Sequence, residues 1–202
     1  MSKLETNTID NISGSTTLTI GDSNTSTIAL KSGATLTNFP ANTPAFNASL
    51  SSDQSLSHNT QTVIQFDSEL YDVGGCYNNT GSTVTLNGIS TPAYAFAPNV
   101  AGKYFFHGSV YILNSSSGAD LILASGIFQN GTATYQNNSR YDTDGASGVT
   151  ASGTIDMNGT SDYIQFFGAQ RNITSESGSR STRGNNSGRI FTYFTAYKLI
   201  GA

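Results

Sequence analysis

The sequence predicts an all-β protein, and three observations lead to this fold class. No window carries apolar residues at helical spacing over three turns, whereas several runs alternate apolar and polar residues with a period of two. The chain has 202 residues with 21 Gly, but only 9 basic and 13 acidic side chains. Asn-Gly and Asp-Gly pairs separate the runs, as in tight hairpins. This length suits one antiparallel two-layer sandwich of roughly ten strands and a short extra segment.

Five runs in which apolar and polar residues alternate predict the central strands. Tight turns are predicted at three dipeptides, Asn130-Gly131, Asp144-Gly145 and Asn158-Gly159, because Asn, Asp and Gly adopt positive φ at little cost. A further strand is predicted at the end of the chain, over residues 190–197. The alternating runs are residues 63–65, 104–113, 121–127, 155–157 and 163–167.

Residues 1–42 differ in kind from the rest, which divides the chain into an N-terminal segment, 1–42, and a C-terminal domain, 43–202. Short Thr-rich strands are predicted here, but their apolar faces are too thin for a core, and an isolated hairpin is marginally stable in water. We expect three chains to bury these faces against one another as an intertwined β stalk. A flexible Ser/Thr/Gly arm is the alternative. The predicted strands are residues 16–20, 26–30 and 34–37.

The last predicted strand has two apolar faces. Ile190, Phe194 and Ala196 lie on one of them. A strand of this kind is normally covered on both faces. In a two-layer sandwich, one face meets the opposite sheet, and the other meets either a loop or another subunit. The second option predicts a subunit interface formed by Phe191, Tyr193, Tyr197 and Leu199.

The stretch 62–106 carries the most specific motifs. A strand ending in Phe66-Asp67 is followed by a Gly-rich loop and then by Ala101-Gly102-Lys103-Tyr104-Phe105-Phe106. This order resembles the globular head of complement subcomponent q, a relative of the tumour necrosis factor jelly roll. The chain departs from that pattern where Ala101-Gly102 replaces Pro-Gly, and where an insert at 82–92 lengthens one connection. The matching loop residues are Gly75, Tyr77, Asn78, Thr80 and Gly81.

Weaker motifs in the same order extend the resemblance to residues 43–199. Residues 44–48 are similar to a Pro-Ala-Phe-x-Ala first strand, and residues 127–131 to a hairpin that ends in Asn-Gly. The region 148–164 and the final strand also stand in the expected places. The resemblance implies a homotrimeric jelly-roll knob that binds surfaces and is not an enzyme. It makes the subunit interface of the last strand a predicted trimer interface.

The overall plan of the chain predicts a viral structural protein. A thin repetitive segment, a composition rich in Thr, Ser, Asn and Gly, and a C-terminal knob are the plan of bacteriophage fibres, which assemble in the host cytoplasm. Residues 3–10 are similar to the openings of fibre-like proteins in phages of marine bacteria. We expect a virion protein, a tail or head fibre, that is anchored to other virion proteins through residues 1–42 and attaches to the host cell through its knob. The alternatives are a capsid decoration protein and a calcium-dependent carbohydrate-binding module.

A long basic stretch, residues 174–189, is the predicted ligand-binding segment. It lacks apolar side chains and is expected to lie between the last two strands. Long loops in compact domains are often functional or disordered. Guanidinium groups bind carboxylates and phosphates bidentately, so an anionic host cell-surface glycan is the expected ligand. The alternative is a solvated loop whose arginines only aid solubility. The candidates are Arg171, Arg180, Arg183 and Arg189.

Asp142 and Asp144 form a candidate calcium site. The run Tyr141-Asp142-Thr143-Asp144-Gly145 has the opening spacing of a calcium loop, because two carboxylates two residues apart can share a hard cation with backbone carbonyls. No Glu follows at the distance that an EF-hand requires, and an ordinary turn is the alternative. Some members of the resembled family bind calcium. No other cofactor is expected.

Catalysis, nucleic-acid binding and membrane insertion are not expected. His58 and His107 are the only imidazoles, and no Gly-x-Ser-x-Gly or Cys-x-x-Cys motif accompanies them. The net charge of −4 offers no broad surface for phosphates. No run reaches the ~18 apolar residues that span a bilayer, and no secretory signal is recognised, so folding in a cytosol is expected. Cys76 is the single cysteine and has no partner for an internal disulfide.

Overall fold

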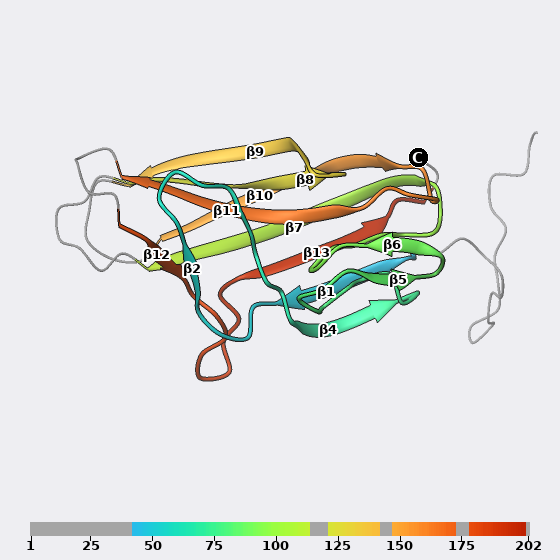
Figure 1. The fold of residues 1–202 in the computed structure, drawn as a ribbon, viewed down its shortest axis with the longest axis horizontal. Coiled ribbons are helices and arrows are strands. Elements are labelled where there is room, and N and C mark those ends of the chain that lie inside the picture. Colours follow the sequence, from blue (N-terminus) through green and yellow to red (C-terminus); the bar gives the residue numbers. More distant parts are fainter. Residues whose placement is uncertain (1–41, 114–120, 142–146, 173–177, 201–202) are drawn as a thin grey trace, which may run out of the picture. The chain divides into compact units, whose positions relative to one another are not determined.

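The computed structural model describes residues 42–113, 121–141, 147–172 and 178–200. These residues belong to one unit of the chain, Pro40–Ala202. The described part contains thirteen strands and no helix (Figure 1). The strands are β1 (Ala45–Ser49), β2 (Gln54–Leu56), β3 (Thr62–Val63), β4 (Ser68–Val73), β5 (Val84–Leu86), β6 (Ile89–Thr91), β7 (Gly102–Leu113), β8 (Leu121–Gln129), β9 (Thr132–Tyr141), β10 (Ser147–Met157), β11 (Ile164–Asn172), β12 (Arg180–Thr182) and β13 (Tyr193–Lys198).

The two main sheets have the strand order of a jelly roll. The first contains β1-β13-β7 with β10 paired to the free edge of β7, and the second runs β3-β11-β8-β9. From β7 to β11, successive strands lie in opposite sheets, except that β8 and β9 form an antiparallel hairpin, as in Greek-key connections. In Figure 1 the four-stranded sheet lies in the upper part of the view, and β13, β1 and β4 lie in the lower part. The predicted all-β jelly-roll sandwich is confirmed.

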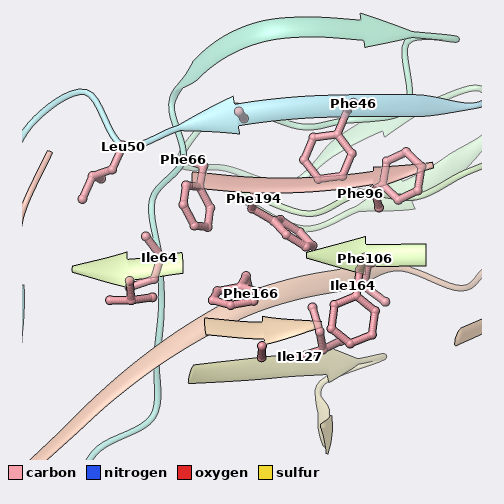
Figure 2. Packing of buried hydrophobic residues seen from close by; sticks show 14 of the residues in the cluster. Phe46, Leu50, Ile64, Phe66, Phe96, Phe106, Ile127, Ile164, Phe166 and Phe194 are labelled. Atoms are coloured by element: carbon pink, nitrogen blue, oxygen red, sulfur yellow. The ribbon is translucent and has the colours of Figure 1, made fainter. Parts of the chain in front are cut away.

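The core lies between the two sheets and is dominated by phenylalanine. Along β7 buried and half-buried residues alternate, which places the even-numbered side chains inside. Phe46 of β1 and Phe194 of β13 point from the first sheet toward Phe166 of β11 and Ile127 of β8 in the second (Figure 2). The rings of Phe46 and Phe194 meet edge to face with centroids 4.9 Å apart, and those of Phe166 and Phe194 lie 5.2 Å apart. Burial of these rings stabilises the sandwich.

The hairpin turns follow the predicted chemistry. Asn130 and Gly131, with φ of 52° and 79°, join β8 to β9, so the predicted Asn-Gly turn is confirmed. Asn87 and Gly88, with φ of 49° and 84°, join β5 to β6 inside the insert at 82–92. This insert was expected only to lengthen a connection, although the same Asn-Gly signal is present in it. The predicted turn at Asp144-Gly145 lies outside the described residues.

Five strands were not predicted, namely β2, β4, β5, β6 and β12. β4 pairs with β1 although its sequence, Ser-Glu-Leu-Tyr-Asp-Val, lacks clean alternation, because the unpaired edge of β1 provides hydrogen-bonding partners. β12 pairs with β2 and with the end of β7 inside the stretch expected to be a loop. The predicted β stalk, residues 1–42, lies outside the described residues except for Asn42, and it stays a prediction.

Candidate functional site

The outward surface of the β7–β13 sheet is rich in half-buried aromatic side chains. Because even-numbered residues of both strands face the core, odd-numbered residues face away from it. We call this surface the aromatic face. It consists of Phe105, His107, Tyr111, Phe191, Tyr193 and Tyr197, all partly exposed.

Cross-strand pairs hold the aromatic face together. Phe105 lies opposite Tyr197 in the register of β7 and β13, with ring centroids 5.5 Å apart. The ring of Tyr111 lies 5.3 Å from that of Phe191. Aromatic pairs of this kind each stabilise a sheet by about 0.5–1.5 kcal/mol beyond area burial. The rings are therefore fixed by their neighbours, while part of each remains accessible.

A polar pair lies within the same face. His107 Nε2 and the hydroxyl of Tyr193 are 2.9 Å apart, and their rings lie at 5.6 Å. This hydrogen bond satisfies one polar group on each side chain, so both residues could be covered by another surface at a lower desolvation cost. In the described structure the role of His107 is this contact with Tyr193.

The same outward face of the sheet continues across β1, which contributes Ala45, 8 % exposed, and Asn47, to exposed apolar side chains on the edge strand β4. Val73 lies in the same register row as Ala45 and Tyr197, so it shares their face of the sheet. Tyr71 and Val73 are 44 % and 47 % exposed. An exposed apolar strand at a sheet edge is a ready site for pairing or packing with another chain. Exposed apolar side chains on this side of the sheet are therefore found on β4 as well as on β7 and β13.

The predicted interface residues cluster only in part. Tyr193 and Tyr197 lie in β13, whereas Phe191 precedes that strand and packs beside Tyr111. Leu199 follows β13, and its backbone N–H donates to the carbonyl of Lys103 at 2.8 Å. Ile190, expected on the core side, is instead 45 % exposed because β13 begins three residues later.

Sequence reasoning missed the partners that β7 contributes to the aromatic face. The signal was present, because alternation over 104–113 sets Phe105, His107 and Tyr111 on one side of a strand. What the sequence lacked was the pairing of β7 with β13, which brings the two rows of rings together. Tyr71 and Val73 were missed because β4 itself was not predicted.

The stretch 174–189 is not a single solvated loop, which corrects the sequence analysis. Its described part contains β12, and the Thr182 hydroxyl donates to the Tyr111 carbonyl at 3.1 Å. Arg180, within β12, is only 6 % exposed. These contacts integrate part of the stretch into the seven-stranded sheet because they satisfy its backbone groups.

The four arginines considered as ligand-binding residues lie in different surroundings. The Arg183 guanidinium lies over the Phe191 ring, 5.1 Å from its centroid, at the border of the aromatic face. Arg189 is exposed in the turn that begins at Asn186. Arg171 is exposed on β11, in the opposite sheet. Of the four, Arg171 and Arg189 present their side chains most openly to a ligand.

The calcium candidates Asp142 and Asp144 lie outside the described residues. Within the described ranges, no three His, Cys, Asp or Glu side chains are grouped so that they could hold a metal ion. The calcium site stays a prediction. The same ranges contain no helix long and apolar enough to cross a membrane.

Comparison with known proteins yields similarities of fold. No protein-family model and no curated protein matches the chain. Among solved structures, the globular domain of zebrafish complement 1qA protein is similar over 77 % of this chain and 96 % of its own, with a TM-score of 0.43 and 11 % identity. Murine APRIL is similar over 73 % of this chain and 98 % of its own, with a TM-score of 0.42 and 12 % identity. The jelly-roll assignment itself follows from the strand order.

Proposed function

We propose that this protein is a non-enzymatic binding protein whose jelly roll forms the knob of a homotrimer. The observation that carries the proposal is the aromatic face, together with the exposed Tyr71 and Val73 on the same side of the sheet. Soluble monomers rarely leave contiguous apolar patches larger than a few hundred Å² exposed, and aromatic residues are enriched where subunits meet. Association of three copies through these faces would remove the rings from water. The motif order that resembles the complement-q head supports a trimer as the assembly.

The proposed setting of this trimer is a bacteriophage virion. The Thr-rich segment 1–42, followed by a β knob in a chain of low charge, supports a tail or head fibre. In this proposal residues 1–42 anchor the trimer to other virion proteins, and the knob attaches to the host cell surface. The protein is then a structural protein of the virion, assembled in the host cytoplasm.

Sedimentation of the full chain tests the assembly. At about 10 µM we expect a particle of three times the 21.2 kDa chain mass. Tyr197→Glu and Tyr71→Glu place a charge in the buried interface and should yield monomers with an unchanged circular dichroism spectrum. Thr134→Glu is the matched control, since Thr134 is exposed on β9 of the other sheet, and it should leave the trimer intact. A monomeric wild-type protein would overturn the proposal.

Electron cryo-microscopy of the virion tests the setting. Trimeric knobs that project from the tail or the capsid would support an attachment fibre. Knobs seated flat on capsid threefold axes would assign capsid decoration instead. Absence of the chain from purified particles would exclude both roles.

A further inference from the structure

The outward face of the four-stranded sheet carries a groove of about 420 Å³. Ala124 of β8 and Ala169 of β11 lie directly opposite each other in its floor, and Ile122 adjoins them. Side chains this small leave a hollow between the longer side chains of the neighbouring strands. The volume falls in the range of small-molecule sites, about 300–1,000 Å³. The groove lies on the sheet opposite to the one that carries the aromatic face.

One wall of the groove is an ordered row of side-chain amides. Gln61 Nε2 donates to Gln136 Oε1 at 2.8 Å, and Gln136 Nε2 donates to Asn138 Oδ1 at 2.8 Å. The row runs from the segment before β3 to β9, where Asn138 lies opposite Ala124. Each amide supplies one acceptor and two donors. Because these hydrogen bonds hold the three amides in place, they present both donors and acceptors to a ligand that lies on the two alanines.

The other wall is held by the backbone. The Asn59 N–H donates to the Gln170 carbonyl at 2.8 Å, which fixes Asn59 beside β11. The Gln170 side chain is 1 % exposed and donates to the carbonyls of Leu56 and Gly178 at 3.3 and 3.0 Å. Both walls are therefore formed before any ligand arrives, which lowers the entropic cost of binding.

The groove is basic in an acidic protein. Arg171 lines it and is exposed, and it forms no ion pair with a carboxylate of the described residues. In the sheet register, Arg171 and Arg140 flank Ile122 on the same face. None of the described lining residues carries a carboxylate, although the chain has a net charge of −4. A ligand with a negative group at this end would meet the Arg171 guanidinium and no carboxylate among the described lining residues.

We propose that this groove binds a saccharide that carries a carboxylate. Arg171 holds the carboxylate, and the amides of Gln61, Gln136 and Asn138 bond to the ring hydroxyls. Sugar hydroxyls both donate and accept hydrogen bonds, so they are complementary to side-chain amides. A ligand with several phosphates would instead require several cationic side chains. This proposal names the cell-surface chemistry that the knob would recognise, and its biological meaning rests on the proposed function in host attachment. The groove itself lies within one chain.

Calorimetric titration of the full-length protein tests the site. The probes are 3′-sialyllactose and trigalacturonic acid, with lactose and maltotriose as neutral counterparts. We expect saturable binding of at least one acidic probe, at least tenfold tighter than its neutral counterpart. Arg171→Gln should weaken that binding tenfold or more, and Asn138→Ala about threefold or more. Both side chains are exposed, so neither variant should impair folding. Ala124→Leu should abolish binding by filling the floor.

A matched charge control is Lys103→Gln on the other sheet. The Lys103 side chain forms an exposed ion pair with Asp156 on the other sheet, apart from the groove residues, so its loss should not change the affinity. If Lys103→Gln and Arg171→Gln weakened binding of the acidic probe equally, the loss would be explained by net charge alone, and the proposed site would be wrong. Failure of both acidic probes to bind would also overturn it.

Sedimentation of the same samples separates this inference from the proposed trimer. Arg171→Gln should remain trimeric while losing the acidic probe. A monomer that still binds the probe through Arg171 would contradict the proposed trimer and support the saccharide site. A trimer that binds neither acidic probe would contradict the saccharide site and support the trimer.

Discussion

The hydroxyl of Tyr77 donates a hydrogen bond to the backbone carbonyl of Phe66 at 2.9 Å inside the core. The Tyr77 ring also stacks on Phe46, with centroids 4.4 Å apart and an angle of 6° between the ring planes. One side chain thus joins the loop after β4 to β1 and to the segment after β3. The tyrosine of the motif that resembles the complement-q head is therefore a structural residue here.

Tyr77→Phe should lower the free energy of unfolding by about 1–2 kcal/mol at pH 7. The variant keeps the stacked ring but leaves the buried Phe66 carbonyl without its donor. Urea unfolding measures the difference. Tyr163→Phe is the control, because no described group accepts a hydrogen bond from the Tyr163 hydroxyl, and it should cost less than about 0.5 kcal/mol. Equal effects of the two variants would contradict the structural role of the bond.

The protein should lose stability as the pH rises above about 10. Burial, and then the negative charges of Glu69 and Asp67, raise the pKa of Tyr77 well above its usual value. Burial also raises the pKa of Tyr104. A pKa that is raised on folding stabilises the native state fully below the unfolded value of about 10, and this contribution is lost above it because the unfolded chain ionises first.

Urea titrations between pH 8 and 11 measure this loss, which for Tyr77 approaches about 1.4 kcal/mol per pH unit. Tyr77→Phe removes one such group, so its free energy of unfolding should fall less steeply with pH. Parallel curves for the variant and the wild type would show that Tyr77 ionises equally in both states.

Gly126→Ala should destabilise the four-stranded sheet by about 3 kcal/mol. A β-carbon at Gly126 would collide with the backbone oxygen of Tyr135 and lie 2.7 Å from the Phe167 ring. Gly148→Ala is the matched control in a strand, since the nearest atom lies 3.6 Å from its β-carbon. Thermal unfolding compares the two. A similar melting temperature for both variants would contradict the close packing over Gly126.

Phe194→Ala should cost about 3–5 kcal/mol, and Phe194→Leu less than about 2 kcal/mol. Phe194 is fully buried, and its ring lies within 6 Å of three others, those of Phe46, Phe66 and Phe166. Val100→Ala, at a position 38 % exposed, should change the stability little. Chemical denaturation of the three variants checks this order, and a small loss for Phe194→Ala would place the core elsewhere.

Short-range signals predicted part of the fold and little of the groove. The Asn130-Gly131 hairpin and the inward face of β7 could be predicted, because a turn conformation and a two-residue period depend on neighbours in the chain. Arg171 was selected for its charge, but it was grouped with Arg180, which β12 buries. Pairing of β12 with β2 and β7 depends on strands far away in the sequence, so the stretch was interpreted as a loop.

The sequence by itself determined the all-β class, the tight turns and the apolar residues available for a core, since these follow from local periodicity and backbone preference. Only the tertiary structure decided which outward faces became functional candidates. Register between distant strands sets Phe105 beside Tyr197, and Ala124 opposite Ala169. It also brings Gln61 to Gln136, 75 residues further along the chain. Such neighbours arise when the two sheets bury a common core, and no local pattern of side chains encodes them.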